Sequence, residues 1–166
     1  MANAFETHDV FNQSPPFENV NLFTSDRALM DAVTREGAGH AVDRLIALGQ
    51  LCGSAEALDQ ARLANENPPR LKAFDGKGRR LDVVEFHPAY HACMELSIRH
   101  GLHCSAWDHL SGEGADPHAG ANVARSAGCY MANQMEAGHQ CPVTMTNAAV
   151  PALLAASARA IGFSHT

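Results

Sequence analysis

Apolar residues recur at helical spacing between residues that start and stop helices, and this pattern predicts an all-α chain. Within residues 42–52, Val42, Leu45, Ile46, Gly49 and Cys52 stand at positions i, i+3, i+4, i+7 and i+10. Residues at this spacing share one face of a helix, which packs against a core. Several segments carry such stripes, so we expect a bundle of about six helices.

Capping residues divide the chain into individual helices. Ser25 or Asp26 would cap a first helix, and Ser54 would cap a third helix that ends before the next pair of prolines. Pro88 suits the first position of a fourth helix, because the first N–H groups of a helix have no intrahelical partner. Gly101 suits the position after its end, because glycine tolerates a left-handed backbone.

Turn residues separate the remaining elements. Asp75-Gly-Lys-Gly78 between two short segments that could pair, Lys72–Phe74 and Arg80–Val84, predicts a small β-hairpin near residues 72–84. The Gly- and Pro-rich stretch 111–120 predicts a loop, followed by a longer helix over roughly residues 119–137. The chain contains no internal repeat.

Residues 1–24 are expected to form an extended arm that precedes the helices. Pro15 and Pro16 block a helix there, because proline lacks the N–H that a helix needs. The arm offers four apolar anchors, with which it would wrap the body of its own chain or a neighbouring subunit: Phe11, Phe17, Leu22 and Phe23.

The stretch Glu136–Pro151 predicts a junction between two helices. Gly138 and Pro142 would close the first, and Thr144 or Thr146 would cap the second, which then begins near Met145. Free N–H donors at such a helix start favour anionic or polarised ligands. The alternative is an ordinary corner of the bundle without a ligand.

Composition and charge restrict the class of protein. The 166 residues are 46% hydrophobic and 18% charged, which indicates one globular domain rather than a disordered chain. The net charge of −6 and the lack of a cluster of Lys and Arg argue against binding to a phosphate backbone. We therefore expect no DNA binding by this chain alone.

The cysteines and the amino terminus favour a cytoplasmic protein. Five widely spaced cysteines, an odd number, fit reduced thiols better than a disulfide framework. The first residues lack the basic and apolar regions of a signal peptide. The most apolar stretch, 148–163, is too short and too interrupted to span a bilayer, so no membrane partner is expected.

Two histidines form the one local pattern that suits a metal ion. His87 and His91 stand four residues apart, so one helix face could present both rings. A third ligand would have to come from elsewhere, and Pro88 places His87 at a helix start, where its ring can bond to the backbone instead. We expect no metal, and this pair is the runner-up. Local spacing assembles no catalytic residues.

Seven segments, in order along the chain, resemble the amino-terminal domain of the AidB-type acyl-CoA dehydrogenases, flavoproteins of the adaptive response to DNA alkylation. The segments are Phe11-Asn-Gln-Ser-Pro-Pro, Asn21-Leu-Phe-Thr-Ser-Asp, Ala32-Val-Thr-Arg-Glu-Gly-Ala, Arg62-Leu-Ala-Asn-Glu-Asn-Pro-Pro, Gly78-Arg-Arg-Leu-Asp, Phe86-His-Pro-Ala-Tyr-His and Glu136-Ala-Gly-His-Gln-Cys-Pro-Val-Thr-Met-Thr. No single segment is decisive, but their ordered combination is specific. The resemblance implies a helical domain over residues 25–154, with an atypical tail at 155–166.

The resemblance implies that this chain is the amino-terminal part of a longer protein. In the family, a β-domain with flavin contacts and a carboxy-terminal helical domain with the catalytic carboxylate follow. Those enzymes remove an α-proton from an acyl-CoA thioester and transfer a β-hydride to FAD. The flavin and the base map onto no residue here, so this chain alone is expected to be inactive, without bound FAD. The resemblance also implies that the DNA association of the family belongs to the carboxy-terminal domain.

By the same resemblance, the helix after the junction lines the acyl pocket. Thr144, Met145, Thr146 and Ala149 would form part of its wall and position the ligand without transferring a proton. The partners would be the flavin and carboxy-terminal domains, an acyl-CoA-like ligand and further copies of the protein, as an oligomer scaffold. Two alternatives stay open: a cofactor-free helical interaction module, and a helical metal-binding protein that uses His87 and His91.

Overall fold

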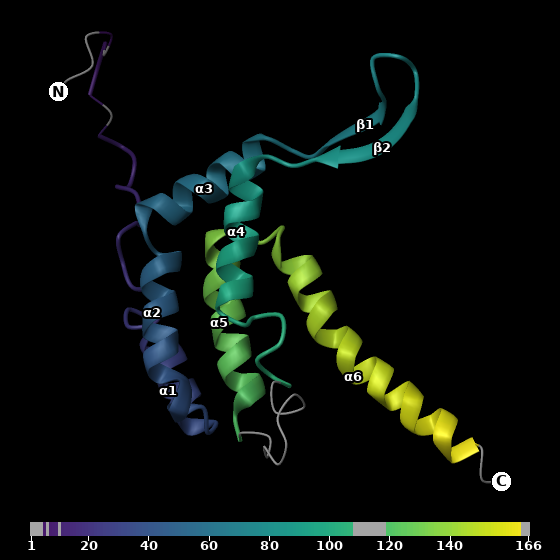
Figure 1. Ribbon diagram of the computed structural model, residues 1–166. Coiled ribbons are helices and arrows are strands. Elements are labelled where there is room, and N and C mark those ends of the chain that lie inside the picture. The colour runs from purple at the N-terminus through teal and green to yellow at the C-terminus, as the bar shows by residue number, and fades with distance from the viewer. Residues whose placement is uncertain (1–4, 6, 10, 108–118, 164–166) are drawn as a thin grey trace.

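The computed structural model describes residues 5, 7–9, 11–107 and 119–163, with side chains up to Ser157. Over these residues the chain forms six α-helices, a short 3-10 helix and a two-stranded hairpin (Figure 1). In chain order they are α1 (Arg27–Arg35), η1 (Gly39–Ala41), α2 (Val42–Cys52), α3 (Ala55–Glu66), β1 (Arg70–Phe74), β2 (Arg80–Glu85), α4 (Pro88–Arg99), α5 (Ala121–Met135) and α6 (Gln140–Phe163). The predicted all-α bundle with a small hairpin is confirmed.

The predicted capping residues define the ends of the early helices. The carboxylate of Asp26 accepts the N–H of Leu29 at 2.9 Å, and the hydroxyl of Ser54 accepts the N–H of Ala57 at 3.1 Å. Gly101 follows α4 with a φ of 69°, a left-handed backbone that few other residues adopt. These local interactions satisfy N–H groups that a helix itself leaves without partners.

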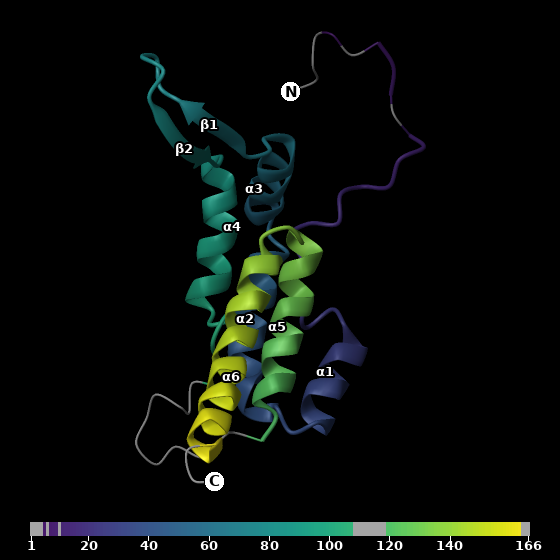
Figure 2. The same cartoon turned by 90° about the vertical axis from the view of Figure 1, so that its right-hand side faces the viewer.

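The buried core lies between α1, α2, α4 and α5. Its largest fully buried side chains include Phe23, Leu45, Leu48, Met131, Val33 and Val143. The views in Figures 1 and 2 show α2, α4 and α5 running beside one another, with α1 against the lower part of the bundle. The first turn of α6 closes this core through Val143, which is 1% exposed.

The last residues of the arm fasten it to α2 through close backbone contacts. Leu22 N–H donates to the Gly49 carbonyl at 3.1 Å, and Val20 N–H donates to the Gly53 carbonyl at 3.3 Å. A Cβ atom at Gly53 would lie 1.9 Å from the Val20 carbonyl oxygen, so only glycine fits this contact.

Two of the four predicted arm anchors are buried. Phe23 is 0% and Leu22 7% exposed, as predicted. The prediction for Phe11 and Phe17 as anchors on the body of the same chain is wrong, because they are 93% and 70% exposed. The reason is visible in Figure 1, where the preceding part of the arm leaves the bundle instead of following its surface.

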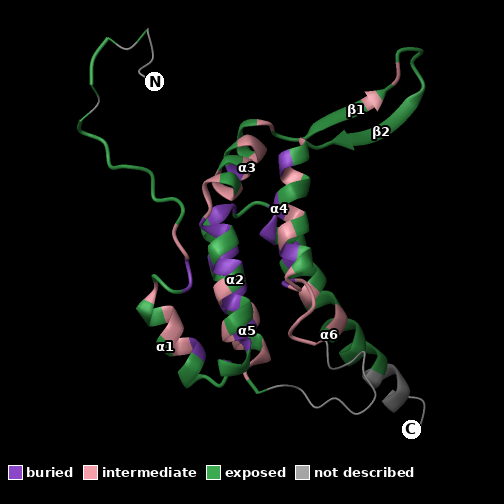
Figure 3. Cartoon of the chain, turned by 60° about the vertical axis from the view of Figure 1, so that its left-hand side comes forward, coloured by how far each residue is buried: buried purple, intermediate pink, exposed green. Residues whose placement is uncertain are grey.

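The hairpin pairs β1 with β2 in antiparallel register and projects from the end of the bundle (Figures 1 and 3). Asp75 shapes its turn: one carboxylate oxygen accepts the N–H groups of Lys77 and Arg79, each at 2.8 Å. The loop predicted at 111–120 lies, except for its last two residues, outside the described part of the chain.

Helix α6 begins earlier than predicted. The expected start near Met145 is wrong, because α6 already includes Gln140. Pro142 was interpreted as a helix stop, but it occupies the first turn of α6, where a missing N–H breaks no helical hydrogen bond. Thr144 and Thr146 therefore lie inside the helix and do not cap it. The predicted closing role of Gly138 is also wrong, because α5 ends at Met135, with Glu136 in an extended conformation.

The described residues contain no helix that is both long and apolar enough to cross a membrane. All five cysteines lie within the described residues, and the structure contains no disulfide between them.

Candidate functional site

The residues predicted to form the pocket wall lie together on an open face of α6. Thr144, Met145, Thr146 and Ala149 are all exposed, Met145 to 67%. Met145 and Ala149 stand four residues apart, so their side chains share one helix face. Val143 points the other way and is buried. Beyond these turns α6 extends away from the bundle (Figure 1), and residues 151–157 are all exposed.

The chemistry of this face is apolar. Residues 140–157 contain no charged side chain. The Thr146 hydroxyl donates to the Pro142 carbonyl at 2.9 Å, which leaves its oxygen as an acceptor only. The face therefore presents methyl groups, a thioether and two hydroxyls. It can contact an apolar chain and orient a polar group, but it offers no acid or base for proton transfer.

Glu136 fixes the start of α6. Its carboxylate accepts the N–H of Gly138 at 2.7 Å and the N–H of His139 at 2.8 Å. A carboxylate at a helix start is also favoured by the partial positive charge of that end. The donors predicted for a ligand at a helix start near Met145 do not exist, because that position lies inside α6; at the actual start, Glu136 accepts the nearby N–H groups of Gly138 and His139.

His139 continues this interaction into a buried polar network that joins α6 to α4. Its Nδ1 lies 2.7 Å from Glu136 Oε2, and its Nε2 lies 2.8 Å from Ser97 Oγ. Gln140 Nε2 donates to Ser97 Oγ at 2.7 Å. An ionised carboxylate only accepts hydrogen bonds, so His139 carries its proton on Nδ1 and accepts with Nε2 when neutral.

The order Glu136, His139, Ser97 matches that of an acid–base–nucleophile triad, but burial excludes that role. Ser97 and His139 are 0% exposed, so no substrate reaches the hydroxyl. Burial by itself would raise the pKa of Glu136, but the hydrogen bonds from His139 and Gly138 outweigh it and hold the pKa below its ordinary value. The network is a structural clamp that sets the direction of α6.

Sequence reasoning missed this network. Ser97 lies more than forty residues from His139 and Gln140, so only the folded chain brings them together. The one local signal was Glu136 placed three residues before His139, the spacing of a side chain that caps a helix start.

Trp107 provides a second attachment for α6. Pro151 lies inside the helix and has no N–H, so the carbonyl of Asn147, four residues earlier, lacks its helical donor. The indole N–H of Trp107 donates to this carbonyl at 3.0 Å. The indole thus supplies the donor that Pro151 lacks, and α6 continues through the proline.

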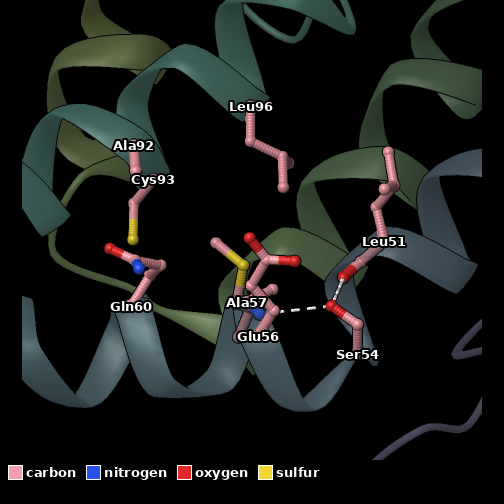
Figure 4. Close-up of a pocket in the computed structure, with 9 residues that line it drawn as sticks. Leu51, Ser54, Glu56, Ala57, Gln60, Ala92, Cys93 and Leu96 are labelled. Carbon is pink, nitrogen blue, oxygen red and sulfur yellow. Dashed lines mark hydrogen bonds between the residues drawn. The ribbon is translucent and has the colours of Figure 1, made fainter.

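A separate cavity of about 200 Å³ lies between α3 and α4 (Figure 4). Leu96, Ala57 and Cys93 line it, and the Cys93 sulfur points into it. Burial, with the nearby charge of Glu136, raises the pKa of the Cys93 thiol to about 11. The thiol therefore stays protonated at neutral pH and does not act as a nucleophile.

His87 and His91 do not converge on a metal centre. His87 caps α4, and its Nδ1 accepts the N–H of Ala89 at 3.2 Å, which is the backbone role considered from the sequence. The His91 ring lies edge-on to the rings of Phe86 and Tyr90. Within the described residues, no group of three or more His, Cys, Asp and Glu side chains could hold a metal ion.

Comparison with known proteins identifies the family. The family model for the adaptive response protein AidB N-terminal domain matches residues 12–164. The chain is 50% identical over 150 residues to the putative acyl-CoA dehydrogenase AidB of Escherichia coli strain K12, covering 90% of this chain and 27% of that protein.

Two solved structures share the fold. The apo form of Bd2924 has a TM-score of 0.73 and 28% identity, and covers 87% of this chain and 28% of its own. Caenorhabditis elegans ACDH-11, crystallised with C11-CoA, also has a TM-score of 0.73, but its 18% identity shows the fold alone. It covers 91% of this chain and 25% of its own.

The chain thus spans about a quarter of the length of these relatives. Because the family model matches nearly all of it, the chain belongs to the family of AidB amino-terminal domains.

Proposed function

We propose that this chain is the amino-terminal helical domain of a FAD-dependent, acyl-CoA dehydrogenase-like protein of the DNA-alkylation response. In that protein it forms part of the acyl pocket wall and serves as a scaffold for the oligomer. The proposal rests on the apolar face of α6, where the described part of the chain leaves Thr144, Met145, Thr146 and Ala149 exposed. The family membership supplies the context.

The geometry of the face supports a role in shaping the pocket. Met145 is 67% exposed and shares its side of the helix with Ala149, while Thr144 and Thr146 add hydroxyl oxygens at its margins. An acyl chain is apolar and its thioester carbonyl is polar, so such a surface can contact both. The clamp of Glu136, His139 and Ser97 fixes the first turn and thereby the position of these side chains.

The same face does not suit the flavin. FAD carries a diphosphate, which proteins bind with backbone N–H groups at helix starts or with cations. Residues 140–157 have no cation, and Glu136 occupies the N–H groups of Gly138 and His139 near the start of α6. We therefore assign no flavin contact and no chemical step to this chain, which alone is expected to be inactive. The remaining domains would hold the cofactor and the base.

Three further aspects complete the proposal. The chain alone binds no DNA, because it carries a net charge of −6. The protein is cytoplasmic, as reduced cysteines favour. The apolar, exposed Leu153 and Leu154 on α6 contact the domains that follow. A gel shift by the isolated chain that persists at moderate salt would contradict the first of these.

The substitution Met145→Trp in the full-length parent tests the pocket wall. A larger ring on the wall occupies ligand space, and overpacking costs about 1–3 kcal/mol, so the dissociation constant of an acyl-CoA thioester should rise about tenfold or more. Isothermal titration measures it. Ile98→Trp on the exposed side of α4 is the control and should leave binding unchanged. Equal affinity of Met145→Trp and the wild type would reject the assignment.

The purified parent also separates the alternatives. Flavin absorbance supports the proposal, whereas a colourless, metal-free oligomer favours an interaction module. Bound metal that is lost on replacement of His91 favours the metal-binding alternative.

A further inference from the structure

The hairpin is an exposed element with an apolar surface, and no helix of the described residues is packed extensively on its strands. Leu71 is 68% and Phe74 63% exposed, and every described residue of β2 is exposed. Figures 1 and 2 show both strands projecting beyond the bundle. An isolated two-stranded hairpin is at best marginally stable in water, so this one needs a partner surface.

One face of the hairpin combines basic and apolar side chains, and two of its cations also pair within the hairpin, Lys72 with Glu85 and Arg80 with Asp82. The register places Arg70 opposite Glu85, Lys72 opposite Val83 and Phe74 opposite Arg80. Side chains at alternate positions, and those directly opposite them, lie on the same face of a sheet. Residues 70–85 contain five Lys and Arg against three Asp and Glu, so their net charge is +2 in a chain whose net charge is −6.

The arm has the opposite character. Residues 5–18 contain three acidic residues and no Lys or Arg. Phe11 and Phe17 are both exposed, Phe11 almost fully, although both are large apolar side chains. Pro15 and Pro16 between them keep the backbone extended, which is the form that lies along a strand. The arm thus offers acidic groups and aromatic rings to a basic, apolar surface.

The described residues of the arm (5, 7–9 and 11–24) do not cover the hairpin of their own chain. Asn19 attaches the arm to the start of α3, where its side chain accepts the N–H of Ala55 at 3.1 Å. The hairpin leaves from the other end of α3, and all three views show the arm and the hairpin diverging (Figures 1, 2 and 3). Two complementary surfaces therefore remain uncovered in a single copy.

We propose that the arm of one copy docks on the basic, apolar face of the hairpin of a second copy. Phe11 and Phe17 pack against Phe74 and Val83, and the acidic residues of the arm lie near the arginines of the hairpin. The inference rests on the proposed role as an oligomer scaffold and names the surfaces that perform it. Charge complementarity selects the partner, and apolar burial supplies most of the affinity.

The test uses two variants of the 166-residue chain, each altered on one surface. The arm variant combines Phe11→Ala with Phe17→Ala, and the hairpin variant is Val83→Asp. Sedimentation velocity measures association of each variant and of their mixture. Each variant alone should associate at least about tenfold more weakly than the wild type, because about 1.4 kcal/mol or more of apolar contact is lost.

The mixture is the decisive measurement. The arm variant keeps an intact hairpin, and the hairpin variant keeps an intact arm. The arm of the hairpin variant can therefore dock on the hairpin of the arm variant. A mixed dimer should appear at concentrations where neither variant dimerises alone. Ile98→Asp, at 42% exposure close to the 45% of Val83, is the control and should associate like the wild type.

The proposal fails if the wild-type chain stays monomeric at 100 μM, about the upper range for the dissociation constant of a weak specific contact. It also fails if either variant associates as well as the wild type, or if the mixture of the two variants stays monomeric. If Val83→Asp lowers the helix content, Arg80→Glu replaces it, because Arg80 is highly exposed and pairs only with neighbouring Asp82. Acyl binding by the parent is measured separately. Failure of the docking therefore leaves the pocket proposal standing, and loss of acyl binding leaves the docking result unaffected.

Discussion

The hydrogen bond from Trp107 to the Asn147 carbonyl should depend on Pro151. In the wild type, Pro151 provides no N–H, so the indole at 3.0 Å replaces the missing helical donor. Trp107→Phe removes the donor but keeps an aromatic ring. In a Pro151→Ala background, the N–H of Ala at 151 donates to the same carbonyl, and the indole is no longer needed.

The expected cost of Trp107→Phe follows from which group donates to the Asn147 carbonyl. A net hydrogen bond contributes about 1 kcal/mol to the free energy of unfolding, and both groups are only half-buried, so water limits the loss to about that value. Trp107→Phe should therefore cost about 1 kcal/mol more with Pro at 151 than with Ala. The change in ring size occurs in both backgrounds and cancels from the difference.

Urea denaturation of the four chains, followed by far-UV circular dichroism, measures this coupling. Fluorescence is unsuitable, because Trp107 is the only tryptophan of the chain. Pro151→Ala alone should stabilise the chain, because proline is unfavourable inside a helix. Equal costs of Trp107→Phe in the two backgrounds would refute the argument that the indole compensates for the proline.

Two further predictions concern the clamp and the arm. The folded state lowers the pKa of Glu136, so its stabilising contribution is present above the ordinary value of 4.5 and is lost as pH falls below it. Glu136→Gln should therefore flatten this part of a plot of unfolding free energy against pH, measured by urea denaturation at each pH. Gly53→Ala should destabilise the chain by about 1–3 kcal/mol in urea, because its Cβ meets the Val20 carbonyl. Gly76→Ala, with open space around it, should match the wild type.

The sequence predicted those elements whose ends depend on local chemistry. Asp26 and Ser54 cap helices through N–H groups three residues ahead, and Pro88 with Gly101 brackets α4. Each interaction lies within a few residues of the chain and has a recognisable residue type. The small hairpin followed in the same way from its Asp- and Gly-containing turn.

The predicted start of α6 was wrong because a proline can either end a helix or lie in its first turn. Proline ends a helix when it falls in the interior, but it is tolerated in the first turn, and Pro142 occupies the first turn. The deciding interaction is the cap from Glu136, whose carboxylate accepts the N–H groups of Gly138 and His139. In the same helix, the carbonyl that Pro151 leaves without a helical donor is bonded by Trp107, which comes from a distant part of the chain.

Tertiary contacts account for what the sequence could not provide. Ser97 and His139 meet only after α4 packs against α6, and no spacing pattern predicts this. The arm shows the same limit: its aromatic residues indicated anchors, but the sequence does not show that Phe11 and Phe17 find no site on their own chain. The open face of α6 was predicted from the family resemblance rather than from periodicity.

A crystal structure of the full-length parent with an acyl-CoA thioester bound tests the central claim most directly. We expect acyl carbons within about 4 Å of the Met145 side chain, the distance of van der Waals contact, with Ala149 on the same wall. An acyl chain bound elsewhere, with this face of α6 covered by polypeptide, would contradict it.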